Sequence, residues 1–69
     1  MKKEYLILLK ELLDKYDMPE EEKQDILEDY SDMYDNYKER GMSEDEVQDK
    51  LGKPKSVIGN LVEGYRRIP

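Results

Sequence analysis

The sequence predicts an all-α protein, a small orthogonal bundle of four helices in a single domain spanning residues 1–69. Two observations lead to this prediction. Apolar side chains recur every three or four residues, which is the period of a helix with one buried face. Turn-forming residues also divide the chain into four segments, at about 3–16, 19–40, 44–51 and 54–66. No segment alternates apolar and polar residues in the way a half-buried strand does.

The first helix carries an apolar stripe at helical spacing. Its members are Tyr5, Leu9, Leu12 and Tyr16, and the stripe is widened by Leu6 and Leu13. Ile7 and Leu8 lie outside this stripe, so we expect part of their surface to stay uncovered in an isolated four-helix domain. Exposed contiguous apolar surface usually marks a docking site.

The second helix is predicted to be long, because neither glycine nor proline interrupts residues 20–40. Pro19 is well placed to open it. Three glutamates follow, at positions where the helix dipole favours negative charge. The predicted core stripe of this helix is Ile26, Tyr30, Met33 and Tyr37, flanked by Leu27 and Tyr34.

Local chemistry defines the two short helices. Gly41 can close the second helix in a left-handed conformation. Ser43 and Glu46 form a predicted capping box at the start of the third helix. Gly52 is expected to end that helix, also in a left-handed conformation, and Pro54 fits the first turn of the fourth, where no amide donor is required.

Composition excludes several classes of site. The chain has no cysteine and no histidine, which rules out a disulfide framework and nearly every transition-metal site. Asp25, Asp29 and Asp32 could align on one helix face, but the ligand spacing and mid-loop glycine of a calcium-binding EF-hand are missing. With no nucleophile–base pair and no phosphate-binding glycine loop, we expect neither an enzyme nor a bound cofactor.

Charge is unevenly distributed. Residues 1–40 hold thirteen Asp/Glu and seven Lys/Arg, whereas residues 41–69 hold five of each. Within residues 52–69, four cations (Lys53, Lys55, Arg66 and Arg67) face Glu63 alone. An acidic long helix is therefore followed by a mildly basic end, and the acidic face is most simply a solvated surface.

A helix-turn-helix DNA-binding domain at residues 44–65 is the alternative interpretation. Lys55, Ser56 and Asn60 would then reach base edges, and Arg66 and Arg67 would contact phosphates. The formal net charge of −6 weighs against it, because DNA-binding domains usually have a basic footprint. The small residue that repressor-type motifs place in the first helix is also replaced, here by Gln48.

Two motifs and their order carry a family resemblance. Gly-x-Ser-x-x-Glu at Gly41–Glu46 is followed by Leu-Gly-x-Pro at Leu51–Pro54, after a leucine-rich first helix and the run Pro19–Glu22. In this order the chain resembles the HAAS signalling-domain family, a bacterial helical module first catalogued as a domain of unknown function. The resemblance implies a module at the cytoplasmic N-terminus of a membrane protein, with no established catalytic residues. The sequence departs from that pattern in ending at Pro69 without a membrane span, and we expect either an excised domain or a short stand-alone version.

We therefore expect a helical protein-interaction module of bacterial regulation, cytoplasmic or at the inner face of the membrane in a longer native protein. Its partner would be another protein or an adjoining membrane segment, with weak homo-oligomerisation as a further expectation. The candidate interaction residues are Ile7, Leu8, Val62, Tyr65, Arg66 and Arg67. Ordinary packing at the edge of the domain is the alternative explanation for all six.

Overall fold

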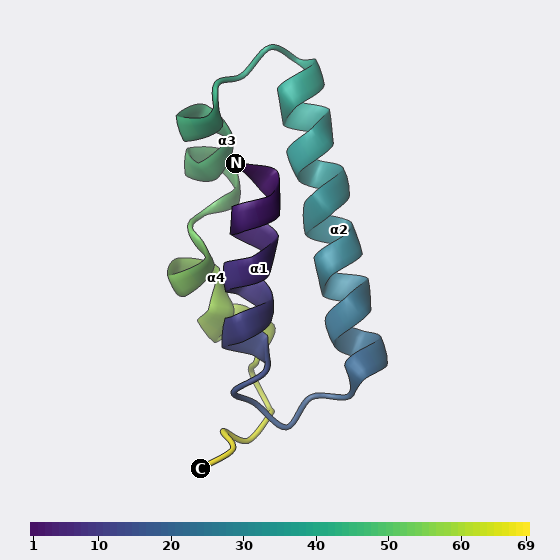
Figure 1. Ribbon diagram of the computed structural model, residues 1–69. Coiled ribbons are helices and arrows are strands. Elements are labelled where there is room, and N and C mark those ends of the chain that lie inside the picture. Colours follow the sequence, from purple (N-terminus) through teal and green to yellow (C-terminus); the bar gives the residue numbers. More distant parts are fainter.

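The computed structural model describes all residues from Met1 to Pro69 and contains helices and turns, with no β-strand. The helices are α1 (Lys2–Leu13), α2 (Glu20–Glu39), α3 (Glu44–Leu51) and α4 (Pro54–Leu61). α1 and α2 form an antiparallel hairpin, and α3 and α4 follow one another along the other side of α1 (Figure 1). The all-α prediction is confirmed. The four helical segments form three legs, the third of which is bent between α3 and α4.

The arrangement is less orthogonal than expected. α1, α2 and the bent third leg all run along the long direction of a molecule that measures 40 × 20 × 18 Å (Figure 1). α1 is the central leg, since it packs against both α2 and α4. α3 packs against α2, the second helix of the hairpin.

Two helices end earlier than their apolar stripes predict. α1 ends at Leu13 rather than at residue 16, because Tyr16 pairs with Arg67 in an isolated antiparallel bridge. α4 ends at Leu61 rather than at residue 66, and Gly64 in the following turn has a φ of 89°. The apolar stripe continues in the sequence beyond both helix ends. Backbone pairing with a distant segment ends α1, and a turn at Gly64 follows the end of α4. The bounds of α2 and α3 lie within one residue of expectation.

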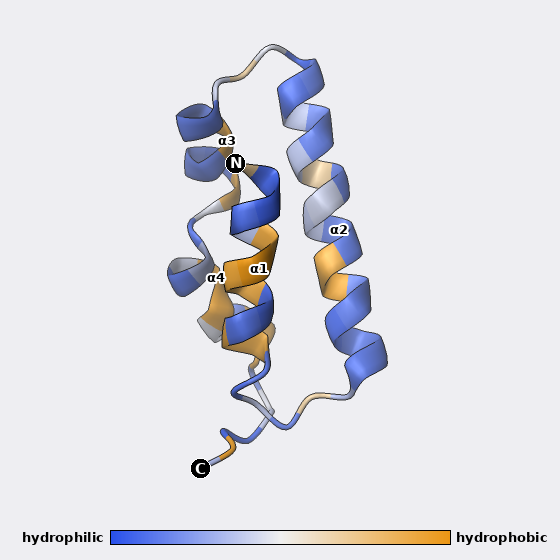
Figure 2. Ribbon diagram, in the orientation of Figure 1, coloured by the Kyte–Doolittle hydropathy of each residue, from blue (hydrophilic) through white to orange (hydrophobic).

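The core lies between α1 and the other helices. Its buried apolar members are Tyr5, Leu9, Leu13, Met18, Tyr34, Val47 and Val62. Apolar colour is concentrated on α1 and α4, whereas α2 is mostly hydrophilic (Figure 2). α2 therefore contributes few buried side chains to the core, although it is the longest helix, and α1 supplies the centre of the core.

The predicted stripe of α2 is displaced by about one position. Tyr34 is almost fully buried, while Met33 is 36% exposed and lies outside the core. The buried line of α2 instead passes through Lys23 and Tyr34, with Leu27 and Tyr30 packed against the core between them. The ring of Tyr5 packs against those of Tyr30 and Tyr34, with centroids 6.2 and 5.9 Å away. An aromatic cluster thus replaces aliphatic packing here.

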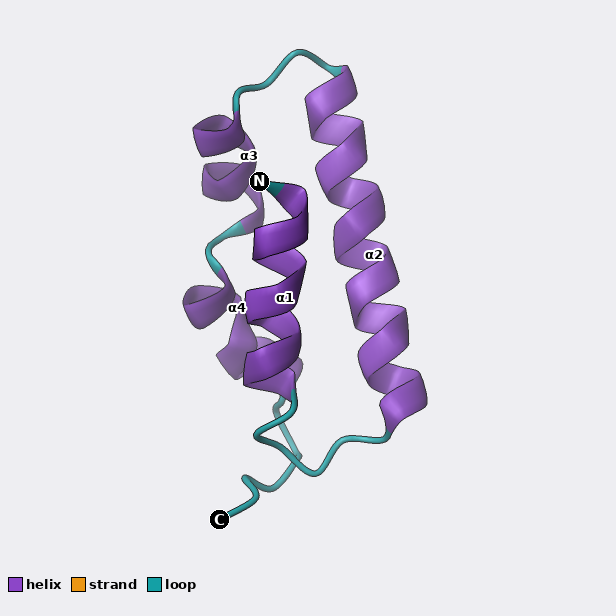
Figure 3. Ribbon diagram, viewed as in Figure 1, coloured by secondary structure: helices purple, strands orange, loops and turns teal.

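Short loops join the helices (Figure 3), and the turn-forming residues that the sequence predicts lie in or beside them. Ser43 Oγ accepts from the Glu46 amide and Glu46 Oε1 accepts from the Ser43 amide, at 3.2 and 2.9 Å. Pro54 occupies the first turn of α4, and Pro19 is the residue immediately before α2. Gly41 has a φ of 88° at the end of α2.

Gly52 adopts a different conformation from the expected left-handed one. Its φ of 87° is positive, but its ψ of 146° is extended. This region of backbone conformation is almost restricted to glycine. The Tyr5 hydroxyl donates a hydrogen bond to the Gly52 carbonyl oxygen at 2.5 Å, so the bend between α3 and α4 is fastened to α1.

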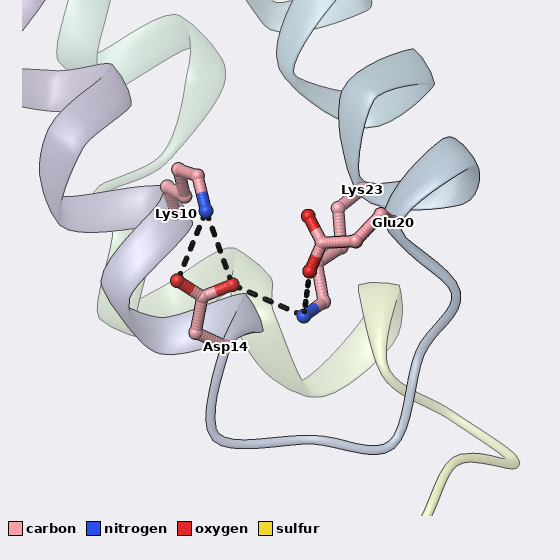
Figure 4. Close-up of polar contacts among 4 residues, drawn as sticks. All are labelled: Lys10, Asp14, Glu20 and Lys23. Carbon is pink, nitrogen blue, oxygen red and sulfur yellow. Dashed lines mark hydrogen bonds and ion pairs between the residues drawn. The ribbon is translucent and has the colours of Figure 1, made fainter.

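Lys23 is the one buried charged residue, at 6% exposure. Its ammonium group lies 3.0 Å from Asp14 Oδ1 and 3.0 Å from Glu20 Oε1, and Asp14 also pairs with Lys10 (Figure 4). These hydrogen bonds to Glu20 and Asp14 raise the pKa of Lys23. Those from Lys10 and Lys23 lower the pKa of Asp14. The network joins the end of α1 to the start of α2.

Candidate protein-interaction surface

The outer face of α1 is the clearest apolar surface on the molecule. Ile7 is 50% exposed and Leu8 is 38% exposed, although both belong to the most apolar helix. Tyr5, Leu9 and Leu13 fill the core from the side of the helix opposite Ile7, and Leu8 lies between these two sides. Since a helix can bury only one side against its neighbours, an excess of apolar residues must face outward.

A shallow groove lies beside Leu8. It has a volume of about 260 Å³ and lies between the first turns of α1 and the junction of α3 and α4. Its lining residues are Met1, Glu4, Tyr5, Leu8, Gln48 and Pro54. Beside this groove, the hydrogen bond from Tyr5 to Gly52 connects α1 to the α3–α4 bend. Three of the six lining residues are hydrophobic, so the groove is only partly apolar.

Charged residues surround Ile7. Lys3, Glu4, Lys10 and Glu11 lie three or four positions away along α1, which places each within one helical turn of it. An apolar centre with a charged rim is the usual composition of a protein–protein interface. The rim contains both signs and is nearly neutral, so it gives no net attraction to a strongly charged partner of either sign.

A polar network fixes the end of the molecule nearest this face. The Glu44 carboxylate accepts a hydrogen bond from the Tyr34 hydroxyl at 2.7 Å and pairs with Lys38 at 2.7 Å. The amino group of Met1 lies 3.4 Å from the same carboxylate. These partners, Lys38 first, lower the pKa of Glu44 to about 2. Burial and then Glu44 raise the pKa of Tyr34 to about 12.

The second predicted surface, at the basic end, is only partly formed. Val62 was expected there but is buried, at 6% exposure, so that part of the prediction is wrong. The chain turns directly after α4, which directs Val62 into the core instead of continuing the helix outward. Tyr65 is half-buried and bonds to Glu22, while Arg66 and Arg67 are exposed and unpaired.

The residues expected to read DNA lie on a short helix. Lys55, Ser56 and Asn60 are exposed on α4, which has eight residues and is therefore about 12 Å long. Arg66 and Arg67 lie beyond the following turn, in a segment that pairs with the α1–α2 loop. Elsewhere on the surface, no group of three or more Asp or Glu side chains is arranged to hold a metal ion.

Sequence reasoning missed the two polar networks. Nothing in the spacing of Lys23, Asp14 and Glu20 distinguishes them from other exposed charges, although Lys23 does fall three residues after Glu20. Lys38, Tyr34 and Glu44 come from two helices, and only the fold brings them together. The one available signal in the sequence was that Lys23 falls on the side of α2 that carries its buried residues, which indicates a buried, paired lysine.

The fold and its surface define a small all-helical domain. Residues 4–59 of the 69 match the family model named HAAS, and the chain therefore belongs to the HAAS family. The matched region extends from the first turn of α1 into α4 and includes both turn motifs. No match was found among curated proteins or among solved structures. None of the helices has both the length and the apolar character needed to span a membrane.

Proposed function

We propose that this domain is a non-enzymatic protein-interaction module of a bacterial regulatory or membrane-associated signalling protein, and that it docks its partner on the outer face of α1. The observation that carries the proposal is the exposure of Ile7 and Leu8 beside a preformed groove. Membership of a family of small helical domains supports a module of this kind. A cytoplasmic location is part of the proposal.

The partner that suits this surface is an amphipathic helix. A helix offers apolar side chains at positions i, i+3, i+4 and i+7, and one of them can enter the groove next to Leu8 while another covers Ile7. Lys3, Lys10, Glu4 and Glu11 would then form a mixed charged rim around the contact. The rigid support comes from α1 itself, whose other side is buried along its length.

A non-enzymatic role is supported by the distribution of the reactive groups. The carboxylates and lysines with shifted pKa values, at Asp14, Lys23, Glu44 and Glu46, all take part in ion pairs or helix caps. Each shift is accounted for by a structural contact at a helix end.

Site-specific photo-cross-linking tests the proposal. A benzophenone amino acid replaces Ile7 in the native host, and the same group replaces Asn36, an exposed residue of α2, as a control. We expect one adduct of defined mass from position 7, absent from position 36 and lost when Leu8→Ser is added.

Two results would contradict the proposal. Equal yields of the same adduct from positions 7 and 36 would mean that the partner does not bind preferentially to the outer face of α1. An adduct that contains only two copies of this chain would assign the α1 face to self-association rather than to a partner helix.

A further inference from the structure

A short segment after α4, residues 65–68, is held to the domain mainly by polar contacts, and we name it the strap. Tyr65 is half-buried, whereas the other three side chains of the strap are exposed. None of the four belongs to the buried core. A segment with few buried apolar contacts and exposed backbone hydrogen bonds opens at a lower free-energy cost than a helical core does. The position of the strap therefore depends on its hydrogen bonds.

The strap lies against the loop that joins α1 to α2 (Figure 1). The Asp17 amide donates to the Arg66 carbonyl oxygen at 2.7 Å. The Ile68 amide donates to the Lys15 carbonyl oxygen at 2.8 Å. The isolated antiparallel bridge lies between these two bonds. Both bonds belong to one short pairing, so the loss of one removes the geometry that supports the other.

Tyr65 connects the strap to α2 as well. Its hydroxyl donates a hydrogen bond to the carboxylate of Glu22. Tyr65 also lines a groove of about 280 Å³ together with Met18, Ile26 and Leu61. Met18 is buried, at 5% exposure. Movement of the strap away from the loop would remove the tyrosine side chain from this groove and leave Met18 with one neighbour fewer.

Gly64 provides a hinge for this movement. Val62, two residues earlier, is buried in the core, so the chain is fixed up to that point. Gly64 has a φ of 89°, and nothing else in the protein lies within 4 Å of the position that a Cβ would occupy. Glycine adopts such a conformation without the steric cost that a side chain brings. The closed position of the strap thus depends on a conformation that other residues disfavour.

We propose that the strap opens and closes as one unit on the folded domain, and that its opening uncovers Met18 in the groove that Tyr65 lines. The bonds to the α1–α2 loop and to Glu22 are made and lost together, while the helices stay folded. The strap does not involve the outer face of α1. It is therefore a conformational switch additional to the proposed docking surface.

Amide hydrogen exchange followed by NMR tests the strap. The Asp17 and Ile68 amides should show equal protection, greater than that of a free amide and less than that of Leu9 within α1, because one opening releases both. Tyr65→Phe and Glu22→Ala should each lower both protection factors together, by roughly 2- to 10-fold for one hydrogen bond. The two changes combined should lower them no further, since they remove the same contact.

Two glycine variants form a matched pair for the hinge. Gly64→Ala and Gly41→Ala both place a side chain at a φ of 88–89° with open space around it, but only Gly64 lies beside the strap. Gly64→Ala should speed exchange of the two strap amides by roughly 5-fold or more. It should also speed oxidation of Met18 by hydrogen peroxide, measured by mass spectrometry. Gly41→Ala should change neither rate, and oxidation of Met1, 67% exposed, should be the same in both variants.

The proposal is wrong if both strap amides exchange as slowly as that of Leu9, because the segment would then open only when the whole domain unfolds. It is equally wrong if they exchange like free amides, or if Tyr65→Phe affects one of them and not the other, since no closed unit would then exist. Unchanged oxidation of Met18 in Gly64→Ala would show that the strap does not cover this residue. The α1 docking surface is unaffected by all of these results, because its test uses a different face.

Discussion

At the scale of single residues, Gly52 illustrates how one position fixes the path of the chain. Its positive φ and extended ψ turn the third leg between α3 and α4, and its carbonyl oxygen accepts from Tyr5 in α1. The need for glycine could be predicted from the Leu-Gly-x-Pro motif. Its ψ value and the hydrogen bond from Tyr5 could not, because both depend on where α1 lies.

Gly52→Ala should lower the stability of the domain. The new Cβ would lie 2.8 Å from Val57 Cγ1, and a φ of 87° disfavours any side chain. Such strain costs about 1–3 kcal/mol, or roughly 4–8 °C of melting temperature per kcal/mol in a domain of this size. Gly52→Val, with a larger side chain, should be worse.

Gly59→Ala is the matched control for this change. Gly59 lies inside α4 with open space around it, and alanine there should stabilise the domain by about 0.5–1 kcal/mol. Thermal melting of the two variants should thus shift in opposite directions. Similar shifts for both would mean that Gly52 is not a conformationally required position.

Glu44 provides a prediction that depends on pH. Its pKa is lowered from 4.5 to about 2 in the folded protein, so its favourable interactions are fully present above pH 4.5 and are lost as the pH falls through about 2. Glu44→Gln should therefore be less stable than the wild type at pH 7, with the difference disappearing towards pH 2.

Asp45→Asn is the control for Glu44→Gln. Asp45 is in the same first turn of α3 but makes no ion pair, so both substitutions remove one charge from the same helix terminus. Urea unfolding at pH 7 and near pH 2 measures the comparison. An equal loss for both variants would show that the helix dipole, rather than Lys38 and Tyr34, accounts for the role of Glu44.

At the scale of elements, the sequence predicts helix starts better than helix ends. Proline and the capping box act locally, and α2, α3 and α4 begin where those residues indicate. The ends of α1 and α4 depend instead on the pairing of Tyr16 with Arg67, two segments far apart in the chain. The displaced stripe of α2 has a similar origin: Lys23 is buried at the start of this helix because Asp14 and Glu20 pair with it, and Tyr34 is buried in place of Met33.

The cap of α3 is testable as an element. Ser43→Ala removes the oxygen that accepts from the Glu46 amide and should lower stability by about 1 kcal/mol. Ser56→Ala is the control, because Ser56 is exposed within α4 and its hydroxyl makes no hydrogen bond within the protein. Chemical unfolding of both variants measures the difference, and an equal effect would exclude a specific role for the cap.

At the scale of the whole molecule, charge and surface determine which partners are suitable. The formal net charge is −6, and the exposed Lys and Arg residues are distributed over the whole chain instead of forming one basic surface. The candidate interaction surface was predictable in part: Ile7 and Leu8 were indicated by a helix too apolar for one core face. The groove next to Leu8 was not, because it forms between α1 and a distant bend.

We expect no sequence-specific binding to duplex DNA at near-physiological salt. A few phosphate contacts from Lys53, Lys55, Arg66 and Arg67 would give only weak affinity that falls steeply with salt. Footprinting on a random-sequence library measures this. A specific footprint that is lost with Lys55→Ala and Asn60→Ala would instead make residues 44–65 a DNA-reading element.

The central claim is that the outer face of α1 is a surface free to receive a partner and not part of the core. Its most direct test is the unfolding free energy of the Ile7→Ser/Leu8→Ser variant, compared with that of Leu9→Ala. Exposed positions usually change stability by no more than about 0.5 kcal/mol each, whereas truncating a buried leucine costs about 2–5 kcal/mol. We predict that the double variant keeps its helicity and nearly all its stability while Leu9→Ala, at a fully buried position, loses several kcal/mol. If the double variant unfolds as readily as Leu9→Ala, Ile7 and Leu8 are core residues and the docking surface does not exist.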